Sequence, residues 1–241
     1  IDHTIDQRGP EGVRVHFYGG PPPPPDLLAA AANHPISVRV RPDLFSRADA
    51  DRLHQAGVKW VELDGLTFSN RALKQIGRKH RRQLMIEILR RLREMGISPG
   101  IVLAPGLPGT DHEQCLVDAR HAVVLADSAR IHPVLVLDRA GLKLAHMDQR
   151  YTPLSMGAAI TTCRAMLDIL ESGNVAVLRV GVQPGPDGLG RAVAGPYHPS
   201  FRQLVDGRRT LDNLRALLDQ RLDIHERGAH VAIICAPADE T

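Results

Sequence analysis

Short apolar, β-branched runs alternate along the chain with longer segments whose apolar residues recur at helical spacing. The stripe of Leu84, Ile88 and Leu92 indicates a helix that packs one face on a sheet. The predicted strands cover residues 13–18, 36–40, 58–63, 97–103, 130–137, 175–182 and 230–235, and the predicted helices cover residues 26–33, 46–56, 81–95, 111–126, 155–171 and 211–222. This alternation predicts a parallel sheet or barrel of the α/β class.

Polar residues occupy one face of several predicted strands. In residues 36–41 the apolar side chains take one face and leave Ser37, Arg39 and Arg41 on the other. A flat parallel sheet with helices on both sides would be almost wholly apolar. An open or partial barrel with a solvated lumen explains the pattern, and edge strands are the alternative. The other polar residues of this kind are Arg14, His16, Glu62, Arg130, His132, Arg179 and Gln183.

Start and stop signals agree with these elements. Thr110 and Glu113 have the spacing of a capping box. Gly57 and Gly96 stand where two helices are expected to end. We find no internal repeat and no second domain. Residues 1–209 are expected to form the barrel, and residues 210–241 to add a helix and a short strand to the same domain.

Composition and charge exclude several classes of protein. The chain is 43% hydrophobic and 24% charged, and no stretch approaches the roughly 18 apolar residues that span a bilayer, so a membrane-spanning protein is excluded. Its 30 Lys and Arg against 27 Asp and Glu give a net charge of +3, which does not by itself indicate nucleic-acid binding. Cysteines at 115, 163 and 235 form neither a CxxC pair nor a disulfide framework, which favours a reducing, cytoplasmic location.

Common catalytic motifs are absent from the sequence. It contains no GxxxxGK[ST] phosphate loop, no GxSxG elbow and no HExxH zinc helix. His112, Glu113 and Cys115 crowd one helix start, but neighbours on a helix diverge, so we expect no metal there. Residues 105–111 precede a helix and can either hold an anion at its start or serve as an ordinary loop.

An ordered set of segments is more specific than any single motif. In order and spacing, these segments resemble the radical S-adenosylmethionine (SAM) proteins related to the Elongator catalytic subunit. The resemblance covers about residues 13 to 206. The segments are Phe-Tyr-Gly-Gly at 17–20, Arg-Pro-Asp at 41–43, Gly-Val-Lys-Trp-Val-Glu-Leu at 57–63, Pro-Gly-Leu-Pro-Gly at 105–109, Arg-Ile-His-Pro at 130–133, Tyr-Thr-Pro-Leu-Ser at 151–155, Arg-Val-Gly-Val-Gln-Pro at 179–184 and Ala-Gly-Pro-Tyr-His-Pro at 194–199.

The resemblance implies a partial (β/α)6 barrel of the radical SAM type. In the family, three cysteines in a loop after the first strand hold a [4Fe–4S] cluster, and SAM binds at the C-terminal mouth of the barrel. We expect this chain to lack that first strand and its cluster loop. The family positions for the cofactor correspond to Tyr18, Gly19, Gly20 and Glu62. The better-known relatives modify RNA.

The sequence departs from the family where the chemistry should be. No CxxxCxxC motif precedes Phe17, and reductive cleavage of SAM needs an iron with an open position, so we expect no catalytic residue and no metal in this chain. The residues after the double glycine are Pro21, Pro22 and Pro23, which donate no N–H groups to SAM. Asp64 and Leu66 replace a Gly and a Gln of the family pattern.

Two functions remain open. In the first, the chain is a pseudoenzyme that retains the barrel as a binding, regulatory or protein-interaction module and needs no cofactor. In the second, it is an N-terminally truncated, Elongator-like enzyme that uses a [4Fe–4S] cluster and SAM. The expected partner is another protein or an anionic small molecule, with RNA possible from the resemblance and no membrane. The predicted ligand pocket consists of Arg39, Arg41, Arg130, Arg179, Gln183, Tyr197 and His198.

Overall fold

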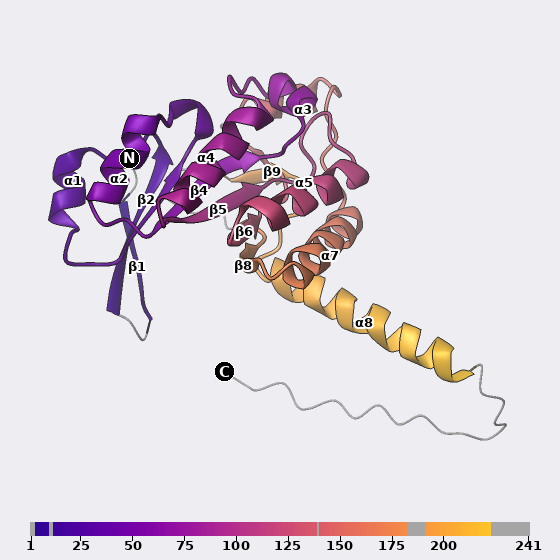
Figure 1. Ribbon diagram of the computed structural model, residues 1–241. Helices are drawn as coiled ribbons and strands as arrows, with labels where there is room; N and C mark the ends of the chain where they lie inside the picture. The colour runs from indigo at the N-terminus through magenta and orange to yellow at the C-terminus, as the bar shows by residue number, and fades with distance from the viewer. Residues whose placement is uncertain (1–2, 10–11, 139, 183–190, 223–241) are drawn as a thin grey trace.

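A twisted sheet runs through the centre of the molecule in the computed structural model, which describes residues 3–9, 12–138, 140–182 and 191–222 (Figure 1). The strands are β1 His3–Gly9, β2 Gly12–Gly20, β3 Ile36–Val40, β4 Trp60–Leu66, β5 Ser98–Leu103, β6 Ser128–Ile131, β7 Val136–Leu137, β8 Ala176–Val180 and β9 Ala192–Ala194. The helices are α1 Pro25–Ala30, α2 Arg47–Gln55, α3 Asn70–Gln75, α4 Arg82–Glu94, α5 His112–Leu125, α6 Leu142–Met147, α7 Met156–Ser172 and α8 Phe201–Leu222, and a 3-10 turn covers Pro42–Leu44.

Six parallel strands make up most of the main sheet. Among the described residues its order is β1-β2-β3-β4-β5-β6-β8; β1 pairs with β2 antiparallel, and each later neighbour is parallel. The six parallel strands curl into a half-barrel, which confirms the predicted partial barrel (Figure 1). A small antiparallel pair, β7 with β9, lies beside it.

The core lies between the sheet and its outer helices. Strand residues such as Leu63 and Ile101 point to this side and are fully buried. They pack in one cluster with Leu53 of α2, Leu89 of α4 and Leu167 of α7. Full burial of each such side chain stabilises the fold by about 1.5 to 3 kcal/mol. The opposite face of the strands is left for the polar residues of the lumen.

Helix boundaries are set by local capping groups. Ser46 and Asp49 form a reciprocal capping box at α2, and Ser155 accepts a hydrogen bond from Ala158 N at α7. The predicted box of Thr110 and Glu113 is wrong. Asp111 is the N-cap of α5 and accepts from Gln114 N at 2.8 Å, while the Thr110 hydroxyl donates to Leu107 O.

Both predicted terminal glycines are confirmed. Gly57 and Gly96 follow α2 and α4 with φ of 76° and 72°, a conformation that costs glycine little.

Three other differences from the sequence prediction have physical causes. The predicted strand at 130–137 is divided into β6 and β7, with Pro133, which has no N–H group, between them. The last helix begins at Phe201 rather than at 211, because Phe201 and Val205 bury one face against the body. The antiparallel strand β1 and the short helices α3 and α6 were not predicted. The strand expected at 230–235 lies outside the described residues.

Within the described part of the chain, no helix combines the length and the apolar character needed to cross a membrane.

Candidate functional site: the charged mouth of the half-barrel

The lumen face of the parallel strands carries a connected set of charged side chains. Because the strands are parallel, their C-terminal ends meet at one edge, where ligands bind in folds of this type. Arg39 on β3 is in register with Glu62 on β4, and Arg130 on β6 with Arg179 on β8. We call the charged residues at this edge the mouth: Arg39, Arg41, Asp43, Glu62, Asp64, Arg78, His80, Arg130, His132 and Arg179.

Glu62 joins the two sides of the mouth. It is 5% exposed, and its carboxylate accepts a hydrogen bond from Arg130 Nε at 2.7 Å and lies 4.0 Å from Arg39 Nε. The side chain of Arg39 keeps 23% of its surface accessible, and that of Arg130 keeps 19%. The pair is therefore buried at the carboxylate and open to solvent at the cations.

The chain's own side chains fill the lumen below Glu62, that is, toward the N-terminal ends of the parallel strands. His16 hydrogen-bonds Ser37, and both line a cavity of about 10 Å³ with Trp60 and Glu62, which is at the lower limit for one water molecule. A Cβ atom at Gly100 would lie 2.8 Å from Ser128 Oγ and 3.0 Å from Trp60 Nε1. Any ligand larger than water must therefore bind above this layer, toward the C-terminal ends of the parallel strands.

Asp64 is held by two arginines. Arg39 donates to one carboxylate oxygen at 2.7 Å, and Arg78 donates to the other at 3.2 Å. Burial alone would raise the pKa of Asp64, but the two guanidinium groups outweigh it and hold the pKa below its usual value. The charge that Asp64 introduces into the family pattern is thus neutralised within the chain.

Asp43 forms the outer rim of the mouth. Arg41 donates to both of its oxygens, at 3.2 and 2.7 Å, and this hydrogen bond raises the pKa of Arg41. Burial opposes ionisation of Asp43, but Arg41 and Arg78 hold its pKa below the usual value. His80 Nδ1 lies 3.6 Å from Asp43 in a fully buried position, and burial lowers the pKa of His80.

Positive charge converges on His132 at the end of β6. Burial, together with the charges of Arg39, Arg130 and Arg179, lowers its pKa to about 3, whereas Asp64 acts in the opposite direction. His132 Nε2 is buried and has no hydrogen-bond partner among the described residues. Arg179 likewise makes no ion pair within the described part of the chain, so this side of the mouth holds uncompensated positive charge.

The structure brings some of the predicted pocket together and leaves other residues apart. Arg39 and Arg130 meet at Glu62, and Arg179 lies beside Arg130 in register. Gln183 lies outside the described residues. Tyr197 and His198 lie in the turn between β9 and α8, where His198 Nδ1 accepts from Ser200 N. Among the described residues, neither forms a hydrogen bond or ion pair with a mouth arginine.

Sequence reasoning missed Arg78 and His80 as members of the mouth and interpreted Asp64 only as a departure from the family. Arg78 and His80 come from the loop between α3 and α4, whereas the predicted pocket was drawn mainly from strand residues. The signal available in the sequence was an unbroken basic run at residues 78–82 directly before a predicted helix.

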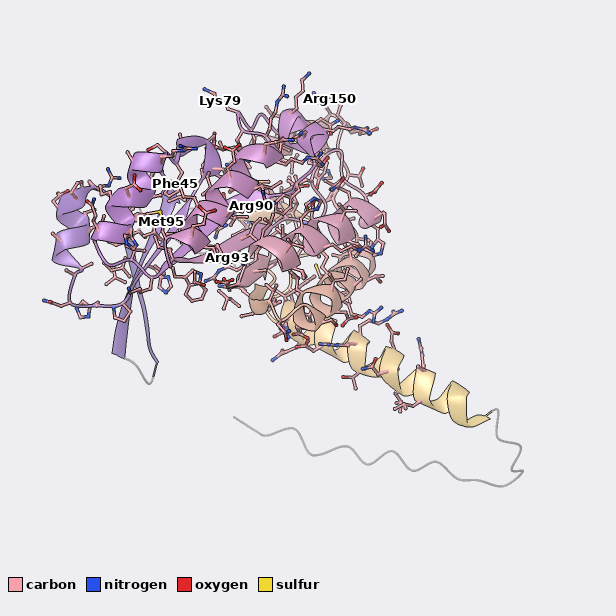
Figure 2. The ribbon with its side chains drawn as sticks, in the orientation of Figure 1. Phe45, Lys79, Arg90, Arg93, Met95 and Arg150 are labelled. Atoms are coloured by element: carbon pink, nitrogen blue, oxygen red, sulfur yellow. The ribbon has the colours of Figure 1, made fainter. Side chains whose placement is uncertain are left out.

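A separate cavity of about 350 Å³ lies between α2 and α4 in the outer layer. Phe45, Ala50 and Ile88 contribute apolar walls, and Arg90 and Glu94 belong to a lining of mixed charge. Figure 2 shows Phe45 and Arg90 over these helices, with Lys79 and Arg150 farther away at the upper edge of the view. The cavity is not part of the mouth.

Comparison with known protein families identifies the class of protein that this fold represents. The model of the radical SAM superfamily matches residues 4–122, and the model of the radical SAM C-terminal domain matches residues 126–211. The two models together cover most of the chain, so the chain belongs to the radical SAM superfamily, as the resemblance predicted, and Elp3-type proteins are among those it is similar to.

This chain spans only part of the length of each relative that it matches. A tRNA uridine(34) acetyltransferase from Dehalococcoides mccartyi (strain CBDB1) is 28% identical over 126 residues, which are 51% of this chain and 28% of that protein. The archaeal Methanocaldococcus infernus Elp3 with an N-terminal deletion has a TM-score of 0.72 at 19% identity, over 83% of this chain and 54% of that one. The radical SAM enzyme coproporphyrinogen III oxidase (HemN) from Escherichia coli has a TM-score of 0.53 at 18% identity, over 66% and 40% of the two chains.

Family membership implies SAM and a [4Fe–4S] cluster in full-length members. The described residues do not fit the cluster, since no group of three or more His, Cys, Asp or Glu among them is placed to hold a metal. Cys115 on α5 and Cys163 on α7 are buried, and burial raises the pKa of Cys115 to about 12 and also raises that of Cys163, so both are thiols rather than thiolate ligands. Cys235 lies outside the described residues.

The family's SAM positions also fit poorly here. The backbones of Tyr18, Gly19 and Gly20 end β2, with Gly20 at a φ of 119°. Pro21, Pro22 and Pro23 then follow without an N–H group to donate. Glu62, the fourth position, is already paired with Arg130. We derive no reaction step through either cofactor.

Proposed function

We propose that this chain acts as a binding module whose barrel mouth takes an anionic ligand, either a small molecule or an acidic surface of a protein partner. The described residues supply no ligand set for a cluster, so the proposal assigns them no radical chemistry. In this proposal the chain is a cytoplasmic pseudoenzyme with an Elp3-type barrel.

The balance of charge at the mouth is the observation that carries the proposal. Five guanidinium groups, from Arg39, Arg41, Arg78, Arg130 and Arg179, face three carboxylates, from Asp43, Glu62 and Asp64. Cations held at a partly buried site are costly without a partner, and an anion is the ligand that compensates them. Guanidinium groups also match the geometry of carboxylate and phosphate oxygens.

Thermal unfolding in the presence of sulfate, phosphate and citrate tests the proposal. Binding to the folded state raises the melting temperature in proportion to ligand occupancy. We expect at least one of these anions to stabilise the chain and Arg179→Ala to abolish that effect while leaving the fold intact. The matched control is Arg93→Ala, which removes an exposed arginine of α4 paired with Asp127 (Figure 2). If Arg179→Ala lowers the melting temperature and changes no anion effect, the mouth is a polar core and the proposal is wrong.

Anaerobic reconstitution of the chain with iron and sulfide tests the absence of radical chemistry. We expect no stoichiometric iron to remain bound, because the described thiols, Cys115 and Cys163, are buried on two separate helices. A stable cluster with about four irons per chain would overturn the pseudoenzyme part of the proposal.

A second candidate, an Elongator-like enzyme that acts on RNA when an upstream cluster segment is present, is favoured by the exposed cations at the α3–α4 turn. Arg71, Lys74, Lys79, Arg81 and Arg82 are exposed, and no acidic residue occurs from 65 to 86. The D. mccartyi relative named above is a tRNA uridine(34) acetyltransferase. For an RNA-binding turn, the double variant Lys79→Ala, Arg81→Ala should weaken binding of a tRNA transcript and reduce its salt dependence by about two charges. Arg179→Ala should leave this salt dependence nearly unchanged.

A further inference from the structure

The two sides of the mouth differ in how completely their charges are compensated. Asp43 and Asp64 lie on the side of β3 and β4 and hold Arg41, Arg39 and Arg78 at contacts of 2.7 to 3.2 Å. On the side of β6 and β8, Arg130 has Glu62, whereas Arg179 has no carboxylate among the described residues. Each side therefore carries one surplus positive charge: three arginines share two carboxylates on the side of β3 and β4, and Arg179 is uncompensated on the side of β6 and β8.

The half-buried side chain of His132 lies beside Arg130 and Arg179 at the end of β6. Its Nε2 atom has no hydrogen-bond partner among the described residues, although unpaired buried polar atoms are uncommon in folded proteins. The charged groups that act on it come from four strands: Arg39 of β3, Asp64 of β4, Arg130 of β6 and Arg179 of β8. Three cations against one anion keep the imidazole neutral as long as nothing else binds.

We infer that the mouth selects a doubly charged oxyanion, such as a phosphate monoester, held by Arg130 and Arg179 beside His132, and that His132 takes up one proton when this dianion binds. The inference rests on the proposed function, since it names the ligand class and the proton linkage of the same site. A dianion matches the surplus of two charges over the whole mouth, whereas a single carboxylate leaves half of that surplus uncompensated. The ligand lies above Glu62 because the cavity below it, about 10 Å³, is too small.

The proton comes from solvent and is accepted by the lone pair of a neutral ring nitrogen. No other bond forms or breaks. The resulting imidazolium becomes a further donor to the oxyanion, so its charge adds to that of the arginines instead of opposing it. Because binding raises the affinity of His132 for a proton, the dianion must bind more tightly as the pH falls.

Sulfate and methyl sulfate are the matched probes. Both are tetrahedral sulfur oxyanions that do not titrate near neutral pH, and they differ by one charge. Calorimetric titration of the chain at pH about 6 should give sulfate at least about tenfold tighter binding than methyl sulfate, since one additional charge pairs with the surplus cations. Titrations in two buffers of different ionisation enthalpy should give a net proton uptake with sulfate.

Two variants separate the components of the inference. His132→Asn should abolish the proton uptake and the pH dependence of sulfate binding, whereas His54→Asn, an exposed histidine near the end of α2, should retain both. Arg179→Ala should abolish sulfate binding, whereas His132→Asn should retain sulfate binding without the proton uptake. Equal affinity for the two probes, or unchanged proton uptake in His132→Asn, overturns the inference and leaves the proposed function standing. If no anion binds at all, the proposed function fails first.

The dianion can come from a small phosphate ester or from the end of a nucleic-acid chain. Methyl phosphate and a 5′-phosphorylated RNA trinucleotide distinguish these sources, with the 5′-hydroxyl trinucleotide as the control. Binding of either phosphate at least as tightly as sulfate supports the inference, and binding of neither contradicts it.

Discussion

The β3–β4 side of the mouth and its β6–β8 side carry similar arginines, but the two sides differ in how those arginines are paired with carboxylates. On the first side, each guanidinium group has a carboxylate supplied by the same side: Arg41 has Asp43, and Arg39 and Arg78 share Asp64. On the second side, Arg130 reaches across to Glu62 on β4, and Arg179 has no carboxylate within the described residues.

This difference distinguishes arginines that are paired within the fold from an arginine that is free to bind an added anion. A partly buried ion pair with both members present mainly maintains local geometry. An arginine without a carboxylate destabilises its neighbours slightly and gains most from an added anion. Substitution of an arginine is therefore expected to lower stability on the first side and to weaken anion binding on the second.

The largest expected effect follows from removing the residue that joins the sides. Glu62→Gln leaves Arg130 and Arg39 without a shared negative charge, and we expect a loss of about 2 to 3 kcal/mol in the free energy of unfolding, less than for a fully buried pair because both arginines are partly exposed. Asp127→Asn is the control: it breaks an exposed pair with Arg93 and should cost below about 1 kcal/mol. Equal losses in urea unfolding would contradict the bridging role of Glu62.

A smaller loss is expected from crowding the layer beneath Glu62. Gly100→Ala places a Cβ atom within 3.3 Å of Ser128, Trp60 and Glu62, so the free energy of unfolding should fall by about 1 to 2 kcal/mol. Gly157→Ala on α7 meets nothing within 4 Å and should stabilise the helix by up to about 1 kcal/mol. Equal urea midpoints for the two variants would mean that the lumen is not packed as described.

Acid titration sharpens the comparison at Asp64. Its pKa is lowered in the folded state, so its contribution to stability is complete above its unfolded pKa of about 3.9 and is lost as the pH falls further. In Asp64→Asn the stability at neutral pH should be about 1 kcal/mol lower, and it should fall less steeply below pH about 4. Urea midpoints measured from neutral pH into the acid range give this slope. A slope as steep as that of the parent chain would show that Asp64 is not held by Arg39 and Arg78.

The smallest effect on stability is expected on the uncompensated side. Arg179→Ala removes a cation that lies in register with Arg130, so the free energy of unfolding should change by less than about 0.5 kcal/mol. Chemical unfolding without added anions measures this change. A loss above about 1 kcal/mol would place Arg179 with the structural arginines of the other side.

Much of the fold could be predicted from periodicity because local patterns determine it. The limits of β3, predicted as 36–40, agree with the structure, and the polar face of that strand lines the lumen. The N-cap of α5 was misplaced by one residue because Thr110 and Asp111 are adjacent and both can cap a helix. Which one does so depends on the turn that precedes the helix, and a spacing rule does not contain that information.

The site could be predicted only in part for a different reason. Strand alternation identifies Arg39, Glu62 and Arg130 as lumen residues, because the period of a strand is fixed. Arg78 and His80 reach the mouth from a loop, whose direction is determined by tertiary packing. The sequence therefore indicates which strand residues share a face, but not that Asp64 is neutralised by an arginine of the α3–α4 loop.

Helix α8 gives the chain an uneven resistance to local unfolding. Its last ion pair with the body among the described residues joins Asp212 to Arg164 of α7 at 3.6 Å, and the helix continues to Leu222 away from the body (Figure 1). The ten residues after Asp212 extend about 15 Å, too short a helix to be stable alone in water. Amide protons from Val205 to Asp212 should therefore exchange slowly with deuterium, those after it quickly, and a protease should cleave first in this distal part.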